Sequence, residues 1–430
     1  MAEIIEYRIP MNQRFFLVLF AAGCLALMTG AGIEPDQTGL VQQTPEGSAI
    51  RFLDGGTPIS VDISLFDNII YLPCRVAGAA SLDFVLDTGA TDNSAIDEQV
   101  AEDLGLEPGR TMMGGGAGPE RVPMRELGGI RLFLPGMELT GFRFMTIPLK
   151  RMEPYWGRKK DGLLGGNILG RLVTQIDYDR NKVTFHDPRS FEASGKGMVI
   201  PLIVQSNSLF VKAKVISEAS NFPKEGLFLL DTGVRTTFFN TPFTARNELI
   251  RNARRTIENI AGYGIGGVVR GIMGRVASIR IGDLEIQRPV VEFSTDTEGI
   301  AGSDRFDGII GADILSRFHV TFDYQKQVMI LQKGAGFPQP FEYDMSGLYF
   351  ISTGETNNVF TVENVVEDSP AAKAGAAKGD LLISVNDLPA SSFTLETLKR
   401  YLRQDGRPVT LRINRAGKVV ELSFRLERLI

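Results

Sequence analysis

The chain has 430 residues, of which 43% are hydrophobic and 23% charged, as in an ordinary globular protein, and this length is enough for roughly two to four domains. The formal net charge of −5 argues against nucleic acid as a partner, and the 47 glycines favour a turn-rich β protein over a helical one. With two histidines and two cysteines, the sequence also argues against a histidine-based triad, a metal site and a disulfide framework, and it indicates no cofactor.

The first element is an uncharged apolar run, residues 15–33, which follows Arg14. Such a run is typical of a secretory signal, so we expect residues 1–33 to be a cleaved signal peptide. Two alternatives stay open: a lipoprotein signal with Cys24 as the acylated residue, and an uncleaved membrane anchor, because the run just reaches transmembrane length. Each predicts an exported protein of the periplasm or cell envelope. Residues 34–49, which are polar, are expected to form a linker.

The next element is a strand-like apolar stretch, residues 82–86, which runs directly into Asp87, Thr88 and Gly89. A carboxylate at the end of a buried strand costs free energy unless the protein uses it. An ordinary Asx-turn after a strand is the structural alternative for a single Asp-Thr-Gly motif.

Further elements follow in the same half of the chain. Residues 94–106 predict a short helix capped by Ser94, because their apolar positions recur at helical spacing. Residues 112–118 form a glycine-rich loop, residues 161–171 contain an Asp-Gly motif before a short helical stretch, and residues 173–185 predict a hairpin.

The second half of the chain repeats this order of elements. The repeated elements are a strand at 208–215, Asp231-Thr232-Gly233, a glycine-rich loop at 262–267, an Asp-Gly motif at 307–317 and a hairpin at 320–331. The two Asp-Thr-Gly motifs begin at residues 87 and 231, 144 apart, and the two Asp-Gly motifs begin at residues 161 and 307, 146 apart. Several elements matched at nearly constant spacing indicate an internal duplication.

This ordered and duplicated set resembles the lobes of retropepsin-like aspartic proteases, and two such lobes in one chain resemble the bilobal, pepsin-like arrangement. The resemblance covers about residues 60–332. It implies a mainly β fold with two tandem retropepsin-like β-barrel lobes, at residues 50–200 and 201–332. Because both lobes lie in one chain, no homodimer is needed to assemble the site, and the sequence predicts no particular oligomeric state.

The resemblance also implies an aspartic endopeptidase that acts on peptide or protein substrates, with Asp87 and Asp231 as its catalytic pair. Two facing carboxyl groups that share one proton can activate a water and protonate the substrate carbonyl. The residues expected to support the pair are Thr88, Gly89, Thr232 and Gly233, and those expected in two flaps over the substrate are Gly114, Gly115, Gly116, Gly264, Ile265 and Gly266. Plain hairpin tips are the alternative for the flaps, and an exported protein that binds peptides without cutting them is the alternative for the whole.

Four arginines precede the second glycine-rich loop, and they predict either a solvated face or a preference for acidic substrates: Arg246, Arg251, Arg254 and Arg255. Asp161 and Asp307 recur in register between the two halves, and we expect them to form turns and not to catalyse.

The last part of the chain, residues 342–430, follows a Gly/Pro linker at residues 333–341 and resembles a PDZ domain. The resemblance implies that the backbone of four successive residues binds the carboxylate of a peptide C-terminus: Gly347, Leu348, Tyr349 and Phe350. Residues 394–404 predict the helix that flanks the bound peptide. A PDZ domain that only packs on the protease lobes is the alternative.

Overall fold

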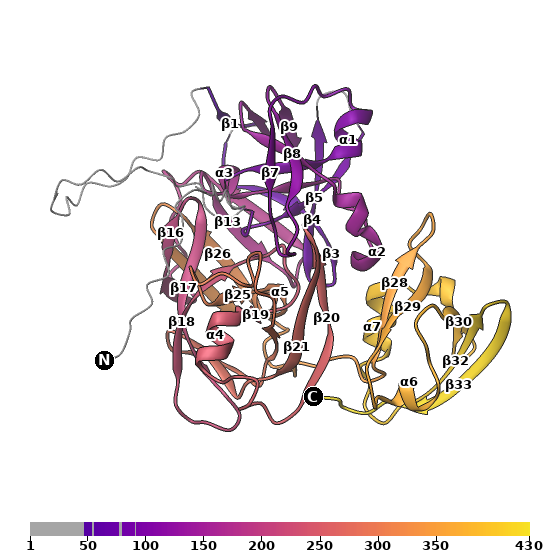
Figure 1. The fold of residues 1–430 in the computed structure, drawn as a ribbon. Helices are drawn as coiled ribbons and strands as arrows, with labels where there is room; N and C mark the ends of the chain where they lie inside the picture. Colours follow the sequence, from indigo (N-terminus) through magenta and orange to yellow (C-terminus); the bar gives the residue numbers. More distant parts are fainter. Residues whose placement is uncertain (1–46, 54–55, 77–79, 91) are drawn as a thin grey trace, which may run out of the picture.

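The computed structural model describes residues 47–53, 56–76, 80–90 and 92–430, which form two β lobes and a C-terminal unit (Figure 1). The predicted signal segment, Cys24 and most of the predicted linker 34–49 lie outside the described residues. Among the described residues, no helix has both the length and the apolar character needed to cross a membrane.

The first lobe is built from short strands with a few one- or two-turn helices. Its strands are β1 Ala49–Phe52, β2 Ile59–Asp62, β3 Ser64–Phe66, β4 Ile69–Val76, β5 Leu82–Leu86, β6 Ser94–Asp97, β7 Thr111–Gly114, β8 Val122–Leu127, β9 Arg131–Leu134, β10 Met137–Thr140, β11 Phe144–Ile147, β12 Gly162–Leu164, β13 Val173–Asp177 and β14 Lys182–His186. Its helices are α1 Glu98–Asp103, η1 Leu149–Met152, α2 Glu153–Trp156 and α3 Gly166–Leu169.

The second lobe has the same character. Its strands are β15 Met198–Pro201, β16 Ile203–Gln205, β17 Ser208–Ile216, β18 Lys224–Leu230, β19 Phe238–Phe239, β20 Thr256–Gly264, β21 Gly267–Arg275, β22 Ser278–Ile281, β23 Leu284–Gln287, β24 Val290–Ser294, β25 Gly308–Ile310, β26 Phe318–Asp323 and β27 Val328–Lys333. Its helices are α4 Thr241–Arg246 and α5 Ala312–Leu315.

The strand order of the two lobes confirms the internal duplication. The main sheet of the first lobe runs β7-β8-β11-β6-β12-β5-β4-β9-β10-β1, and that of the second runs β20-β21-β24-β19-β25-β18-β17-β22-β23. Each of the nine strands in the second-lobe order therefore has a counterpart at the same place in the first lobe, which carries β1 as an additional edge strand. In both lobes, the strand that leads to the Asp-Thr-Gly motif pairs in parallel with the strand that follows the Asp-Gly motif, β5 with β12 and β18 with β25.

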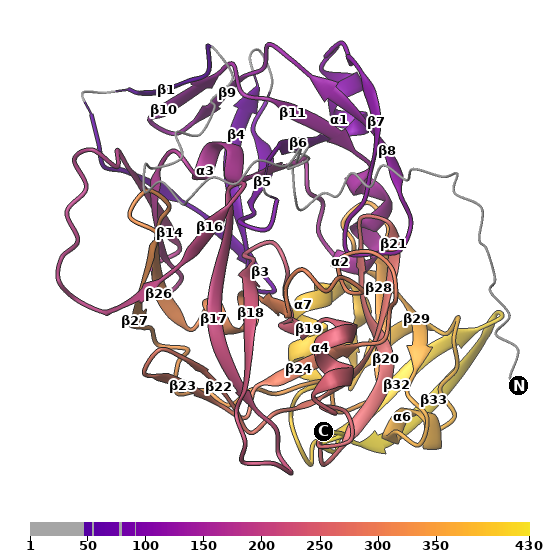
Figure 2. The same ribbon diagram turned by 60° about the vertical axis from the view of Figure 1, so that its left-hand side comes forward.

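A further sheet joins the lobes, in the order β15-β27-β26-β13-β14-β2. Its central pairing, β13 with β26, brings together the two predicted hairpins, one from each half of the chain. Figure 2 shows this sheet beside both main sheets. The predicted lobe limits of 50–200 and 201–332 remain predictions, since this sheet contains strands from both lobes.

The helix predicted at 94–106 is wrong in its first turn. Residues 94–97 form β6, and the helix α1 begins after it, at Glu98. Asp97, and not Ser94, caps the helix, because its side chain accepts hydrogen bonds from the N–H groups of Gln99 and Val100. Pairing of β6 with β11 and β12 outweighs the local helical pattern.

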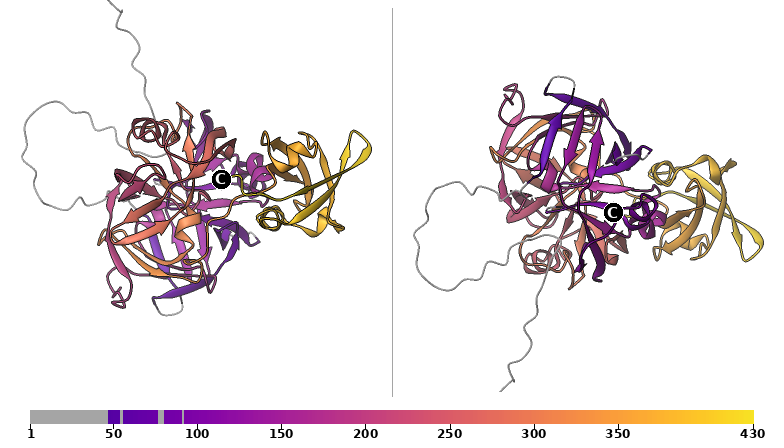
Figure 3. Two further views of the ribbon diagram at one scale, coloured as in Figure 1. Left: turned by 90° about the horizontal axis from the view of Figure 1, so that it is seen from below. Right: turned by 90° about the horizontal axis from the view of Figure 1, so that it is seen from above.

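The C-terminal unit is a separate small β fold beside the lobes (Figures 1 and 3). Its elements are β28 Leu348–Thr353, β29 Val359–Val365, α6 Pro370–Lys373, β30 Leu381–Val385, β31 Leu388–Pro389, η2 Ala390–Ser392, α7 Leu395–Tyr401, β32 Pro408–Arg415 and β33 Lys418–Arg425. Its own hydrophobic core includes Phe350, Phe360 and Leu398, and β28 is the edge strand that pairs only with β29 among the described strands. The helix predicted at 394–404 is present as α7, with Thr394 as its cap.

Candidate active site

The two Asp-Thr-Gly turns meet where the lobes face each other. The N–H of Asp87 donates to the Leu164 carbonyl over 3.0 Å, and the N–H of Asp231 donates to the Ile310 carbonyl over 3.1 Å. The apolar Leu-Leu and Ile-Ile pairs after each Asp-Gly motif thus support the Asp-Thr-Gly turns from behind, through strands β12 and β25.

Thr88 and Thr232 bind each other's turn in a reciprocal network. The Thr88 N–H donates to Oγ1 of Thr232 over 3.2 Å, and the Thr232 N–H donates to Oγ1 of Thr88 over 3.1 Å. Each hydroxyl then donates across the lobe interface, Thr88 to the Leu230 carbonyl at 2.8 Å and Thr232 to the Leu86 carbonyl at 2.7 Å. Both threonines are fully buried, so this network fixes the relative position of the two turns.

The carboxyl groups of Asp87 and Asp231 are held against each other's turn. Oδ1 of Asp87 accepts from the N–H groups of Gly89 and Ala90, and Oδ1 of Asp231 accepts in the same way from Gly233 and the next residue. A Cβ placed on Gly89 would lie 2.0 Å from Oδ2 of Asp231, and one on Gly233 would lie 2.5 Å from Cγ of Asp87. Only glycine leaves room for this close approach.

The environment of the pair opposes two negative charges. Burial raises the pKa of both carboxyl groups, and the neighbouring Asp87 carboxylate raises the pKa of Asp231 further. The groups also share a side-chain hydrogen bond. Two carboxyls in this arrangement hold one proton between them over a range of pH.

A cavity of about 200 Å³ opens above the pair, and both glycine-rich hairpins border it. Gly115 and Gly116 line it from the β7–β8 hairpin, and Gly264 and Ile265 line it from the β20–β21 hairpin. The two tips also touch each other, because the N–H of Gly118 donates to the Ile265 carbonyl over 2.9 Å. The remaining predicted flap residues, Gly114 and Gly266, belong to the same hairpins but are not among the residues that line the cavity.

Helix α2 lies at the tip of the second hairpin and reaches the cavity. Its Trp156 lines the cavity and donates its indole N–H to the Tyr263 carbonyl over 3.0 Å. Tyr155, the preceding residue, stacks on the Tyr263 ring with centroids 3.9 Å apart. These aromatic contacts hold the second hairpin to the first lobe.

Four charged groups that line the cavity, besides the aspartate pair, were not predicted from the sequence: Lys160, Glu292, Asp67 and Arg235. Lys160 is 8% exposed, and its ammonium lies 3.7 Å from the centre of the Trp156 ring. Burial lowers the pKa of Lys160 to about 8, although the Asp87 carboxylate favours its charged form. Glu292 is 3% exposed, and burial raises the pKa of its carboxyl to about 8. Its Oε1 has no hydrogen-bond partner within the described part of the chain.

Other charged residues singled out in the sequence take structural positions. Asp161 and Asp307 each accept a hydrogen bond from a backbone N–H, of Asp83 at 2.7 Å and of Leu227 at 2.8 Å. The arginines before the second flap do not line the cavity, and Arg246 pairs with Asp307. The hypothesis that this cluster selects acidic substrates is therefore not supported.

The family comparisons agree with this geometry. An aspartyl protease family model matches residues 72–168 and again residues 218–314, and a PDZ domain model matches residues 361–415. The chain carries two aspartyl-protease regions and a C-terminal PDZ domain. The predicted mainly β architecture of two retropepsin-like lobes and a PDZ domain is thereby confirmed.

Two individual proteins are also similar to this chain. The carboxy-terminal-processing protease of Bartonella bacilliformis is 30% identical over 110 residues, which are 25% of this chain and 25% of that protein, so the chain spans about a quarter of the length of this curated relative. The crystal structure of the aspartic proteinase from Irpex lacteus is 12% identical, with a TM-score of 0.43, and the match covers 65% of this chain and 98% of that one.

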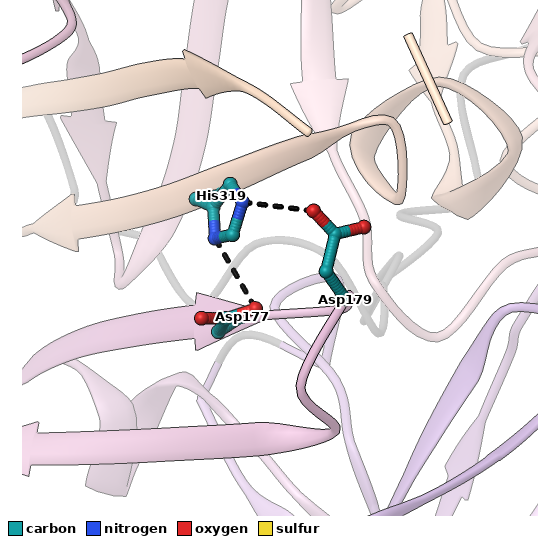
Figure 4. A group of neighbouring side chains, drawn as sticks. All are labelled: Asp177, Asp179 and His319. Atoms are coloured by element: carbon teal, nitrogen blue, oxygen red, sulfur yellow. Dashed lines mark ion pairs between the residues drawn. The ribbon is translucent and has the colours of Figure 1, made fainter. Parts of the chain in front are cut away.

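One of the two histidines lies beside carboxylates that are distant from it in sequence. His319, on β26 of the second lobe, lies between two carboxylates of the first lobe (Figure 4). Its Nδ1 is 3.2 Å from Oδ1 of Asp177, and its Nε2 is 3.0 Å from Oδ2 of Asp179. Because both ring nitrogens face a carboxylate at hydrogen-bond distance, this cluster links the two lobes when the ring is protonated. Pairing of β13 with β26, which the sequence does not reveal, brings the three residues together.

At the predicted peptide-binding loop of the PDZ domain, backbone N–H groups already donate hydrogen bonds to a side chain of the domain itself. The N–H groups of Ser346 and Gly347 both donate to Oδ1 of Asp344, at 2.9 and 2.7 Å. Leu348 and Phe350 pack into the PDZ core. Tyr349 lies at the contact with the two lobes, where burial raises the pKa of its hydroxyl and Arg235 of the second lobe opposes this shift. The predicted role of this loop in carboxylate binding stays a prediction.

The first lobe packs on the open edge of the PDZ domain. Helix α2 lies against β28, where the Ser352 hydroxyl donates to the Pro154 carbonyl over 3.4 Å. The carboxylate of Asp67, in the turn after β3, pairs with Arg235 and lies 3.6 Å from the Lys399 ammonium of α7. The domain packing that the sequence analysis left as an alternative is therefore present, and it covers the edge at which a PDZ ligand would add.

Proposed function

We propose that this chain is an aspartic endopeptidase that hydrolyses peptide bonds with a water activated by Asp87 and Asp231. The observation that carries the proposal is the mutual approach of the two carboxyl groups, each against the glycine of the opposite turn. The reciprocal threonine bonds support it, because they hold the pair in one geometry and reduce the reorganisation that the reaction requires.

The chemistry follows from one proton shared by two carboxyls. The ionised carboxylate removes a proton from the water as the water attacks the peptide carbonyl, and the protonated carboxyl gives its proton to the carbonyl oxygen. The two flap hairpins exclude bulk water and hold the extended substrate over the pair. No covalent enzyme intermediate is formed, since the attacking oxygen comes from water.

The test is cleavage of denatured casein and of a mixed peptide library by the full chain and by its Asp87→Asn variant. The proposal predicts new peptide termini, identified by mass spectrometry, with the wild type only. Peptides that bind to the wild type and stay intact would instead favour the peptide-binding alternative.

The PDZ domain is proposed to bind the free C-terminus of a substrate or regulator at the edge of β28. Lys399 and Arg403 border the cavity at the start of β28 and supply positive charge for a carboxylate. A peptide at this edge competes with α2, and α2 also holds Tyr263 of the second flap. The ligand therefore changes turnover of short substrates.

Peptides with free and with amidated C-termini test this PDZ role. Free peptides should bind the full chain and alter its turnover of an end-blocked short substrate, while amidated twins should do neither. Equal effects of both would contradict carboxylate recognition.

Export is proposed from the apolar run at 15–33, with a cleaved signal ranked before a lipidated Cys24 and before a retained anchor. Mass spectrometry of the native N-terminus decides among these. A cytosolic protein that retains Met1 or begins at Met11 would contradict export.

A further inference from the structure

Lys160 is a buried cation in the catalytic cavity that makes no direct ion pair among the described residues, although the carboxyl groups of Asp87 and Asp231 act on it from a distance. Its side chain lines the same cavity as Asp87 and Asp231 and is 8% exposed. Among the residues that the structure describes, its ammonium has neither an ion pair within 4.0 Å nor a hydrogen bond, and its one specific contact is the Trp156 ring, 3.7 Å away. The adjacent Lys159 differs, because it is largely exposed and pairs with Asp161 at 3.3 Å.

The fold does not require a cation at this position. Lys160 immediately precedes the Asp-Gly motif of the first lobe, and Phe306 immediately precedes that of the second. Phe306 is 6% exposed and packs in an apolar cluster. Since the duplicated architecture accepts an apolar side chain at the equivalent place, the buried ammonium of Lys160 points to a functional use.

We propose that the Lys160 ammonium binds the carboxylate of an aspartate or glutamate side chain of the substrate, close to the bond that is cut. The proposal rests on the proposed endopeptidase function and names the substrate class that this function prefers. A substrate carboxylate would complete the missing ion pair inside a cavity that the flaps shield from water, where such a pair is strongly favoured over its neutral analogue.

The neighbours of Lys160 set the pH range of this preference. Asp87 and Asp231 favour its charged form, whereas burial and the Arg235 guanidinium oppose it, and the pKa of Lys160 lies at about 8. The ammonium is therefore charged where an aspartic pair works. A glutamate side chain of the substrate ionises above about pH 4.3. The preference should appear above that pH and fade above about pH 8.

The experiment uses end-blocked fluorogenic peptides of one cleavable sequence, with Glu or its neutral twin Gln placed in turn at each position near the cut bond. The full chain and its variants Lys160→Met, Lys160→Arg and Lys160→Glu are compared, with Lys159→Met as the matched control. We expect the wild type to cleave one Glu peptide with about tenfold or more higher kcat/KM than its Gln twin.

Lys160→Met should lose that ratio because kcat/KM falls more for the Glu peptide than for its Gln twin. Lys160→Arg should restore the ratio, and Lys160→Glu should reverse it in favour of a Lys-containing peptide. Lys159→Met should leave it unchanged. A second series with Gln side chains and a free C-terminus distinguishes a side-chain carboxylate from a terminal one. A preference of the second series alone would contradict the proposal as stated.

A Glu/Gln ratio of kcat/KM that stays unchanged in Lys160→Met overturns the proposal. An equal loss of kcat/KM on both peptides also overturns it, because Lys160 would then act on the aspartic pair or on folding. Thermal melting of each variant separates these two cases. If the wild type cleaves no peptide, the endopeptidase function fails, and fluorescence anisotropy of the same twins still tests Lys160. Selective weakening of Glu-peptide binding in Lys160→Met supports its role, and equal or absent binding refutes it.

Discussion

Replacing Gly233 with alanine tests whether the two turns approach each other as closely as the structure indicates. A Cβ on Gly233 would lie 2.5 Å from Cγ of Asp87 and within 2.7 Å of both carboxyl oxygens, whereas ordinary contact begins at about 3.4 Å. The Asp87 carboxyl must therefore withdraw by roughly 1 Å, because the threonine bonds hold the Asp231 turn in place. A misplacement of about 1 Å in a catalytic group costs on the order of a hundredfold in rate.

The assay is kcat/KM for one peptide cleaved by the wild type, together with the thermal unfolding temperature. Gly233→Ala should lose about two orders of magnitude in kcat/KM, and overpacking should cost roughly 1–3 kcal/mol of stability. Gly128→Ala is the matched control, because a Cβ on this exposed glycine meets no atom within 4 Å. A folded Gly233→Ala protein with wild-type activity would refute the close approach of the carboxyl groups.

Three further substitutions probe the clamp, the cavity and the domain contact. Thr232→Val leaves the N–H of Thr88 without its partner and should lower the free energy of unfolding, measured by urea denaturation, by roughly 2–4 kcal/mol. Thr232→Ser should restore the wild-type stability, and an unchanged urea midpoint in Thr232→Val would contradict a structural role of the reciprocal threonine bonds. Burial raises the pKa of Glu292 to about 8 in the folded state, from 4.5 in the unfolded chain, so the folded state holds a proton that the unfolded state releases and stability is lost as pH rises from 4.5 through 8. Glu292→Gln should therefore match the wild type in free energy of unfolding near pH 4 and exceed it by up to roughly 3 kcal/mol at pH 7. The same difference at both pH values would show that burial does not perturb this carboxyl. Asp67→Asn removes the ion pair that joins the first lobe to Lys399 of the PDZ domain, so small-angle X-ray scattering should give a larger radius of gyration and a protease should cut the linker at residues 333–341 faster. Unchanged scattering and unchanged linker cleavage would mean that this ion pair does not hold the PDZ domain against the first lobe.

The aspartate pair could be predicted because the information about it is local and repeated. Each aspartate follows an apolar strand within a matched series of elements, so the duplication singles out Asp87 and Asp231, and the family resemblance implies that they face each other. The roles of Thr88 and Thr232 came from the family resemblance, and their reciprocal bonds agree with it.

Residues whose importance depends on non-local packing were not predicted. His319 and Lys160 are unremarkable in sequence, and they gain their partners through strand pairing between the lobes and through burial beside Trp156. One signal for Lys160 was present: the duplicated position holds Phe306, and a charge that replaces an apolar residue between two copies of one unit marks a candidate for function. Ser94 was misjudged as a helix cap because β-pairing of residues 94–97 outweighs a local pattern.

The docking of the PDZ domain had no sequence signal. It depends on a short helix, α2, and on the turn that contains Asp67, both of which belong to the first lobe and meet the edge of β28 and the helix α7 only in the folded chain. Linker composition indicated where the domain begins, but it carried no information on which of its faces is covered.

The central claim is that Asp87 and Asp231 act as one unit on one water. Its most direct test is kcat/KM of a single peptide across pH for the wild type, Asp87→Asn, Asp231→Asn and the double variant. The account predicts a bell-shaped profile for the wild type, loss of cleavage in each single variant, and a double variant little worse than either, with all three variants still folded. Substantial cleavage by either single variant, or additive losses in the double variant, would contradict it.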